Sequence, residues 1–169
     1  MVTSVGSEPT VLANIVGSVP ATRAAMTGMY TPSFLVPIND VGNPYVSQIK
    51  TVVEAAGLPW NFYTYYGANT AYVLSQALKA AGPNLTRKGL VKALQDNAKN
   101  FRSAAVVPFI ITDNSHQGLT GYYMGQYDSS GNVVRLGKPN EIYVAGNAGG
   151  SLAKVATFKA APPTKKLLP

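Results

Sequence analysis

Two helical segments with clear start and stop signals most constrain the fold of this chain. The first lies between Asn43, which is placed to cap a helix, and Gly57, which is placed to stop it. Pro44 suits the first turn, where a missing N–H costs no hydrogen bond. The apolar positions recur at helical spacing: Val46, Ile49, Val53 and Ala56. This pattern predicts an amphipathic helix that must pack on another layer.

The second helical segment begins near Gly67 and ends at Gly82-Pro83. Its apolar face is predicted to consist of Ala71, Leu74, Leu78 and Ala81. A third helix is predicted after Thr86, a suitable cap, although Gly89 weakens its first turn. Its inward positions are Leu90, Leu94 and Ala98.

Strand signals alternate with these helices and predict an α/β fold. Near the start, TSVGSEPTVLANIVG is typical of a strand end, a turn and a brief helix, and Ala24 to Tyr30 predicts a second strand. After Phe101, VVPFIIT is β-branched and aromatic, and LTGYYMGQY alternates before the DSSG turn and the returning NVVRL. This region predicts a strand followed by a β-hairpin. From Gly146 onward, small residues and prolines without a period predict a poorly ordered tail.

Composition excludes several function classes. The 169 residues are 46% hydrophobic, which is adequate for the core of one domain or two lobes. The chain has no cysteine, so it has no disulfide, thiol nucleophile or Cys-based zinc site. The charge of +7 is scattered, with several basic residues in the last stretch, and predicts no nucleic-acid surface. No apolar run is long enough to cross a membrane, and MVTSVGSEPT lacks the features of a signal peptide.

Ser115-His116, which holds the only histidine, raises the question of catalysis. A Ser-His-Asp site would need His116 oriented by a carboxylate such as Asp113, and a serine presented at a sharp turn. No Gly-x-Ser-x-Gly motif is present, so we expect a polar turn in which Gly118 permits an unusual φ. One histidine and dispersed carboxylates predict no metal site, and the glycines from Gly146 to Gly150 lack the Gly-Lys-Ser/Thr of a phosphate loop. No enzymatic activity and no cofactor are therefore predicted.

The order of the elements resembles a known family. The pattern P-x-V-x-x-I in the first helix is followed by WNFYTYYGANTAYVLSQALKAAGPNLTRKGLVKAL, a hydrophobic strand, SHQG and GYYMGQYDSSGNVVRLG. This combination resembles the C-terminal part of ABC-transporter solute-binding proteins of the branched-chain amino acid, or Leu/Ile/Val-binding, type. The resemblance extends from about Val2 to Gly137, and the ordered set rather than any single motif carries it.

The resemblance implies part of a type I periplasmic-binding-protein fold. Such proteins have two α/β lobes that are joined by three hinge-crossing strands and close on a ligand between them. By this resemblance, residues 1–59 belong to the second lobe, and residues 60–105 supply a hinge crossing and first-lobe helices. Residues 106–145 supply the return crossing and the hairpin, and 146–169 the tail. The helices would lack their first-lobe sheet, so we expect self-association or a complementary N-terminal segment.

The implied function is that of a non-enzymatic solute-binding component of an ABC importer. It would bind a small molecule in an interlobe cleft and present it to a membrane permease, on the periplasmic or extracellular side of the membrane. An alternative is a ligand-sensing receptor module with the same lobes, which would signal rather than deliver cargo. A serine hydrolase is the third class, and labelling of Ser115 by a fluorophosphonate would favour it.

Ligand-binding residues are expected in loops at the carboxyl ends of strands. One such loop carries Ser4, Gly6, Ser7 and Glu8, and another begins at Tyr30. Aromatic residues also cluster near the expected hinge, where they could line a pocket or belong to the core: Trp60, Phe62, Tyr63, Tyr65 and Tyr66. By position, Tyr63 matches an aromatic residue that lines the pocket of the family.

One departure from the family bears on the ligand. Amino-acid-binding members usually carry an acidic residue in the first loop, where it pairs with the ligand ammonium. Val5 occupies that position here, between Ser4 and Gly6, and Glu8 substitutes only if the loop shifts. A buried ammonium without a partner is costly. A carboxylate-bearing or aromatic compound is therefore as good a candidate ligand as an amino acid.

Overall fold

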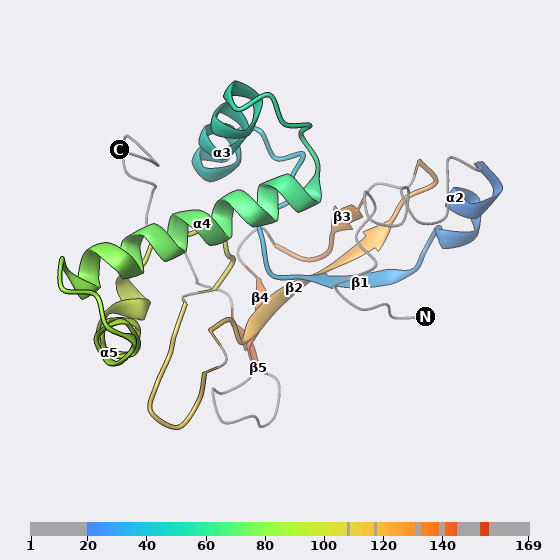
Figure 1. Ribbon diagram of the computed structural model, residues 1–169. Coiled ribbons are helices and arrows are strands. Elements are labelled where there is room, and N and C mark those ends of the chain that lie inside the picture. Colours follow the sequence, from blue (N-terminus) through green and yellow to red (C-terminus); the bar gives the residue numbers. More distant parts are fainter. Residues whose placement is uncertain are drawn as a thin grey trace.

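The computed structural model describes residues 20–107, 109–116, 118–130, 133–138, 141–144 and 153–155. Helices and strands alternate only in part, because three helices are followed by four strands (Figure 1). None of the helices in these ranges is long and apolar enough to cross a membrane. The elements are α2 (Pro20–Met26), β1 (Tyr30–Ser33), α3 (Pro44–Ala55), α4 (Phe62–Ala81), α5 (Arg87–Asn97), the short η2 (Ala98–Asn100), β2 (Gly121–Tyr127), β3 (Val133–Arg135), β4 (Ile142–Val144) and β5 (Ala153–Val155).

Strand β2 is the centre of an antiparallel sheet. It pairs with β1 so that Tyr30 lies opposite Gln126 and Ser33 opposite Tyr123. β3 returns along β2 and confirms the expected hairpin, while β4 pairs with the start of β2, and β5 pairs with β4. Alternate residues of β2 are buried, as expected for a strand with one face on a core. In Figure 1, α2 lies at one end of the β1–β2 ribbon, and α3 and α4 lie toward the other end.

Helix α3 confirms its local signals. The Asn43 side chain accepts a hydrogen bond from the Tyr45 N–H at 3.0 Å, and Pro44 opens the helix. Gly57, with φ of +70°, follows its end. Val46, Ile49 and Val53 are buried as predicted, whereas Ala56 is exposed and Tyr45 is buried instead.

Helix α4 begins one and a half turns before the position expected from the sequence. Asn61 and Thr64 form a reciprocal capping box, with both bonds at 3.1 Å. The end at Gly82 is as predicted. The buried face differs from the prediction and consists of Tyr65, Asn69, Tyr72 and Ala77. Of the residues expected to face inward, Ala81 is half-buried and the other three are exposed: Ala71, Leu74 and Leu78.

Helix α5 follows its predicted cap, since Thr86 Oγ1 accepts from the Gly89 N–H at 3.0 Å. Ala98, at the start of η2, is buried as predicted, and Leu90 and Leu94 are half-buried. The fully buried residue of α5 itself is Ala93.

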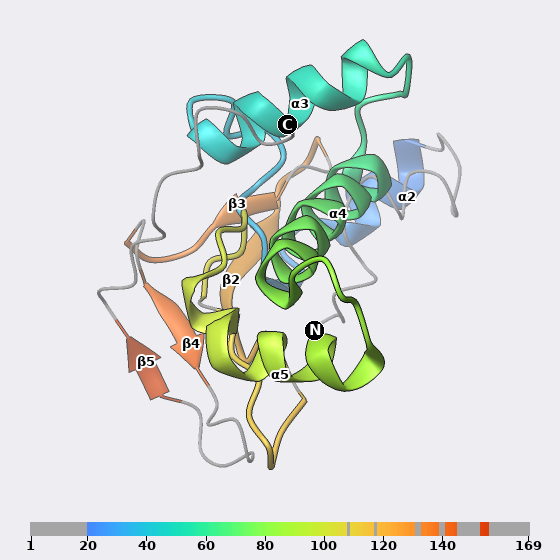
Figure 2. The same cartoon turned by 60° about the vertical axis from the view of Figure 1, so that its left-hand side comes forward.

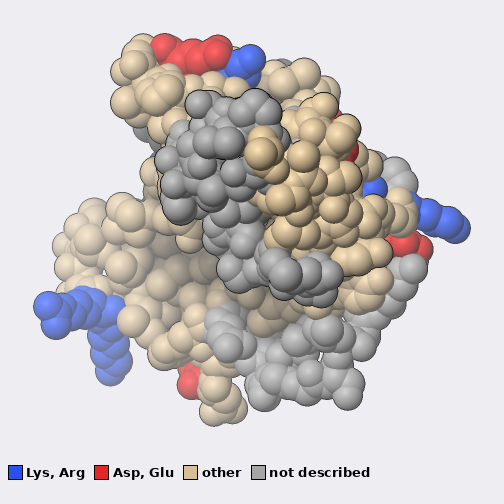
Figure 3. Space-filling model, turned by 90° about the vertical axis from the view of Figure 1, so that its right-hand side faces the viewer, with Lys and Arg blue, Asp and Glu red and all other residues tan. Residues whose placement is uncertain are grey.

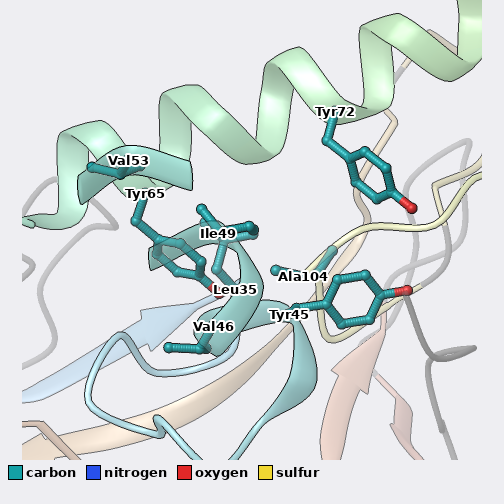
Figure 4. Packing of buried hydrophobic residues seen from close by; sticks show 9 residues of the cluster. Leu35, Tyr45, Val46, Ile49, Val53, Tyr65, Tyr72 and Ala104 are labelled. Carbon is teal, nitrogen blue, oxygen red and sulfur yellow. The ribbon is translucent and has the colours of Figure 1, made fainter. Parts of the chain in front are cut away.

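The main core lies between α3, α4 and the segment after β1. Tyr65 reaches from α4 toward Leu35 and Ile49, and Tyr72 and Tyr45 lie further along the same layer (Figure 4). A second cluster under the sheet consists of Val106, Val107, Tyr123 and Ile142. Helices and sheet are therefore joined by apolar contacts through one continuous stretch, the residues around Ala104 to Val107.

Two strand predictions are wrong. Residues Ala24 to Met26 belong to α2, because alanine and methionine favour a helix, and the strand begins only at Tyr30 after Gly28 with φ of +83°. The described residues of VVPFIIT form no strand. Their backbone hydrogen bonds join them to loop residues, and they pair with no strand. Within the last stretch of the chain, residues 153–155 form β5, which pairs with β4. The expected strand end and helix in the first residues lie outside the described ranges.

Candidate functional site

Two extended segments connect the helices to the sheet. Phe34–Val36 continues from β1, and Ala104–Val106 follows η2. Val36 N–H donates to the Ala104 carbonyl at 2.9 Å, and Val106 N–H donates to the Phe34 carbonyl at 2.8 Å. Leu35 and Ala105 face each other as a bridge and both are buried. We call these paired stretches the crossing segments, because the chain passes between helices and sheet through them.

Polar side chains of α4 hold the second crossing segment in place. Asn69 Oδ1 accepts from the Ala104 N–H at 2.7 Å inside the core. The Gln76 amide accepts from the Arg102 N–H at 2.8 Å and donates to the Arg102 carbonyl at 2.7 Å. Backbone groups that would be buried without partners are thereby satisfied. The amide groups of Asn69 and Gln76 therefore hold the backbone of the second crossing segment, and they are not free to bind a ligand.

An aromatic patch lies beside the crossing segments, at the first turns of α4. Phe62 stacks on Tyr66 with ring centroids 6.2 Å apart, and Phe34 meets Tyr66 edge to face at 5.9 Å. Tyr63 is 51% exposed and Tyr66 45%. We call Phe34, Phe62, Tyr63 and Tyr66 the aromatic surface. Rings with exposed faces and polar tips suit contact with a flat apolar or aromatic molecule.

Trp60 and Tyr65 support this surface from the core side. Their rings lie 5.4 Å apart, and Trp60 is half-buried against the main core. Tyr65 is completely buried, and its hydroxyl donates to the Val36 carbonyl at 3.1 Å. Burial raises the pKa of the Tyr65 hydroxyl far above its usual value, so the group stays neutral.

The residues predicted to bind ligand are only partly brought together. Ser4, Gly6, Ser7 and Glu8 lie outside the described residues. Tyr63 lies on the aromatic surface, whereas Tyr65 lies inside the core behind it. Tyr30 is at the far end of β1 from Phe34, roughly 13 Å away along the strand.

Phe34 is a member of the aromatic surface that the sequence reasoning missed. It follows the end of β1 and reaches Tyr66 across 32 positions of sequence. Its position just after a strand was the available signal, because side chains at strand ends often line sites. The sequence analysis instead predicts a binding residue at Tyr30, because it expects the strand to end there.

The segment around Ser115-His116 is a tight polar turn. Thr112 and Ser115 exchange backbone hydrogen bonds at 3.0 and 3.3 Å, and Thr112 Oγ1 also accepts from the Ser115 N–H. His116 is exposed. Gly118 has no positive φ, contrary to expectation; a side chain there would collide with the Phe109 ring. The close approach of that ring therefore requires glycine.

An open groove of about 640 Å³ lies between α5 and residues 111–113. Val91 and Ile111 contribute apolar surface, and charged and polar residues line the rest. Lys92 pairs with Asp96 at 2.8 Å, and this hydrogen bond raises the pKa of the Lys92 ammonium. The charges of the groove thus partly compensate each other. Helix α5 follows the C-terminal end of α4 (Figure 1), so this groove lies far from the aromatic surface at the first turns of α4.

Comparison with known proteins places the chain in a family. The family model for periplasmic binding proteins matches residues 8–132. A substrate-binding periplasmic protein from Ralstonia solanacearum has a similar structure, with a TM-score of 0.64 and 21% identity over 80% of this chain and 37% of its own. A branched-chain amino acid ABC transporter protein from Thermus thermophilus with bound valine gives a TM-score of 0.52 and 12% identity, over 82% of this chain and 38% of its own.

No curated protein sequence matches the chain. The chain spans less than two fifths of the length of either solved structure. At these identities the two structures show the fold, which agrees with the α/β arrangement of helices and sheet expected from the resemblance. Since the family model matches well over half of the sequence, the chain belongs to the periplasmic binding protein family.

Proposed function

We propose that this chain is part of the solute-binding component of an ABC importer. The aromatic surface beside the crossing segments is the observation that carries the proposal. Proteins of this kind close two lobes about a hinge, and ligands are held where the lobes meet. Exposed rings next to the segments that join helices and sheet are where such a ligand would be enclosed. The chain would act without catalysis, on the periplasmic or extracellular side of the membrane, and deliver its ligand to a permease.

The proposed lobe division follows the same geometry. Residues 1–59 would belong to one lobe and residues 60–105 to the other, with residues 106–145 returning to the first and 146–169 forming the tail. The crossing segments support a hinge between the helices and the sheet. Across the proposed boundary, α3 and α4 share one core through Ile49 and Tyr65. Motion between lobes would therefore have to leave this contact intact or open it.

The proposed ligand is an aromatic or carboxylate compound rather than leucine or valine. Tyr63 would supply an exposed wall, with Tyr65 behind it. The loop of Ser4, Gly6, Ser7 and Glu8, together with Tyr30, would supply polar contacts from the other lobe. Val5 stands where amino-acid-binding relatives carry an acid, so an ammonium group would lack its partner.

Calorimetric titration of the chain with benzoate and with leucine tests the function and the ligand class together. We expect benzoate to bind more tightly, and Tyr63→Ala to weaken that binding by about fivefold, since loss of a stacked ring costs about 1 kcal/mol. Trp60 is the only tryptophan, and its place behind the aromatic surface makes its fluorescence a second readout. Thr51→Ala, on the exposed side of α3, is the control and should bind as the wild type does.

Submicromolar binding of leucine that Glu8→Gln abolishes would show an amino-acid site of the usual family kind. Benzoate binding that Tyr63→Ala leaves unchanged would show that the aromatic surface is not the site.

A further inference from the structure

The aromatic surface is built from two parts of the chain. Three of its rings lie on the first turns of α4, and the fourth, Phe34, lies on the first crossing segment. Figures 1 and 2 both show the chain rising from the sheet past α4 to reach α3. In the proposed lobe division, Phe34 belongs to residues 1–59 and the other rings to residues 60–105. The surface therefore spans the boundary across which the proposed hinge bends.

The second crossing segment holds the backbone of Phe34. The Phe34 carbonyl accepts a hydrogen bond from the Val106 N–H at 2.8 Å, and the Val36 N–H donates to the Ala104 carbonyl at 2.9 Å. Leu35, between these two bonds, is buried and bridges to the second crossing segment. Because the main chain is fixed on both sides of Leu35, the Phe34 ring and the crossing segments move together.

The ring of Phe34 reaches from the crossing segment to α4. It meets Tyr66 edge to face, with ring centroids 5.9 Å apart and planes at 81°. Phe62 stacks on the same tyrosine at 6.2 Å, and both phenylalanines are half-buried against the main core. Phe62 and Tyr66 are four residues apart on one helix, so their contact does not depend on the angle between helices and sheet. The contact of Phe34 with Tyr66 joins two segments and changes with that angle.

Charged side chains are scarce beside these rings. Lys79 is the one charged residue of α4, and it lies in the last turn, whereas the rings lie on the first turns. Figure 3 shows charged side chains at the edges of the view and uncharged residues over most of the described surface between them. The ring of a bound ligand would therefore be held by ring faces and edges, and each aromatic contact contributes measurably to affinity.

We propose that Phe34 couples ligand binding to the angle of the hinge, because an aromatic ligand touches Phe34 and the rings of α4 together in only one arrangement of helices and sheet. This inference rests on the proposed function and adds the residue through which the ligand acts. A ligand shifts an equilibrium between two arrangements only by the difference in its affinity for them. One aromatic contact changes affinity by about fivefold, so contact with Phe34 shifts the ratio of the two arrangements by about that factor.

Two spin labels measure the arrangement of helices and sheet directly. The chain has no cysteine, so Leu85→Cys and Val134→Cys take labels at those two positions alone. Both residues are exposed; Leu85 follows α4, and Val134 lies on β3. Double electron–electron resonance gives the populations of the label-to-label distances. Saturating benzoate should shift the ratio of two such distances by about fivefold relative to the chain without benzoate.

Phe34→Leu and Phe62→Leu are matched variants, because each removes one half-buried ring and keeps an apolar side chain. Both should weaken benzoate binding by about fivefold. At benzoate concentrations that saturate each variant, Phe62→Leu should shift the distances as the wild type does, whereas Phe34→Leu should leave them as they are without benzoate. Circular dichroism checks that the variants fold, and Phe34→Met gives the same test if Phe34→Leu does not. Phe34→Tyr keeps the ring and should respond as the wild type does.

The outcomes separate this inference from the proposed function. A wild-type chain that does not bind benzoate would overturn the proposed ligand and this inference with it. Benzoate that binds but leaves the label distances of the wild type unchanged would overturn the coupling alone. The same holds if saturating benzoate shifts the distances equally in Phe34→Leu and Phe62→Leu, since the ligand would then act on the hinge without Phe34.

Discussion

At the scale of single residues, Tyr45 makes stability depend on alkaline pH. Burial raises the pKa of its hydroxyl to about 12. The unfolded chain loses this proton near pH 10 and the folded chain keeps it, so the free energy of unfolding falls as pH rises from 10 toward 12. Between pH 9 and pH 11, Tyr45→Phe should lose about 1 kcal/mol less stability than the wild type in urea titrations. Tyr63→Phe, at an exposed ring, is the control; equal pH slopes for Tyr45→Phe and wild type would contradict the assignment.

At the scale of elements, the Gln76 amide joins α4 to the second crossing segment. Gln76→Ala leaves the Arg102 N–H and carbonyl without their side-chain partner, which should lower the free energy of unfolding by about 2 kcal/mol. Urea unfolding followed by circular dichroism measures this loss. Gln95→Ala on α5 is the matched control, because the Gln95 side chain has no hydrogen bond within the described chain, and it should change stability by less than about 0.5 kcal/mol. Similar losses for the two variants would show that the hydrogen bonds of Gln76 to Arg102 add nothing to stability.

At the scale of the whole molecule, the shared core of α3 and α4 should make the two proposed lobe portions unfold together. Ile49→Ala removes a fully buried side chain from this core and should cost about 2 to 4 kcal/mol. Hydrogen exchange should then rise in α4 as well as in α3, since Tyr65 packs in the same core. Val41→Ala, at an exposed position before α3, should leave exchange unchanged. A rise confined to α3 would show that the two portions are independent units.

The sequence by itself determined the features that depend on neighbours a few residues apart. The Asn43 and Thr86 caps, the stops at Gly57 and Gly82, and the hairpin of β2 and β3 all follow from hydrogen bonds and backbone angles within one or two turns. The order of these elements was also enough to predict the family, which the comparison confirms. The sequence also predicted that the aromatic residues before and within α4 form a cluster. It did not predict which of them are buried and which are exposed.

Only the tertiary structure decided which face of each element is buried. Periodicity predicted an inward stripe of Ala71, Leu74 and Leu78, but α4 carries apolar residues on its other side as well, so spacing alone cannot choose the buried side. The choice follows from partners distant in sequence: Tyr65 finds the Val36 carbonyl, and Asn69 the Ala104 N–H. Phe34 joins Tyr66 for the same reason, through a contact between segments that no local pattern links. Local hydrogen bonds set where a helix starts and stops, whereas its buried side is set by the free energy of packing against whatever the fold brings beside it.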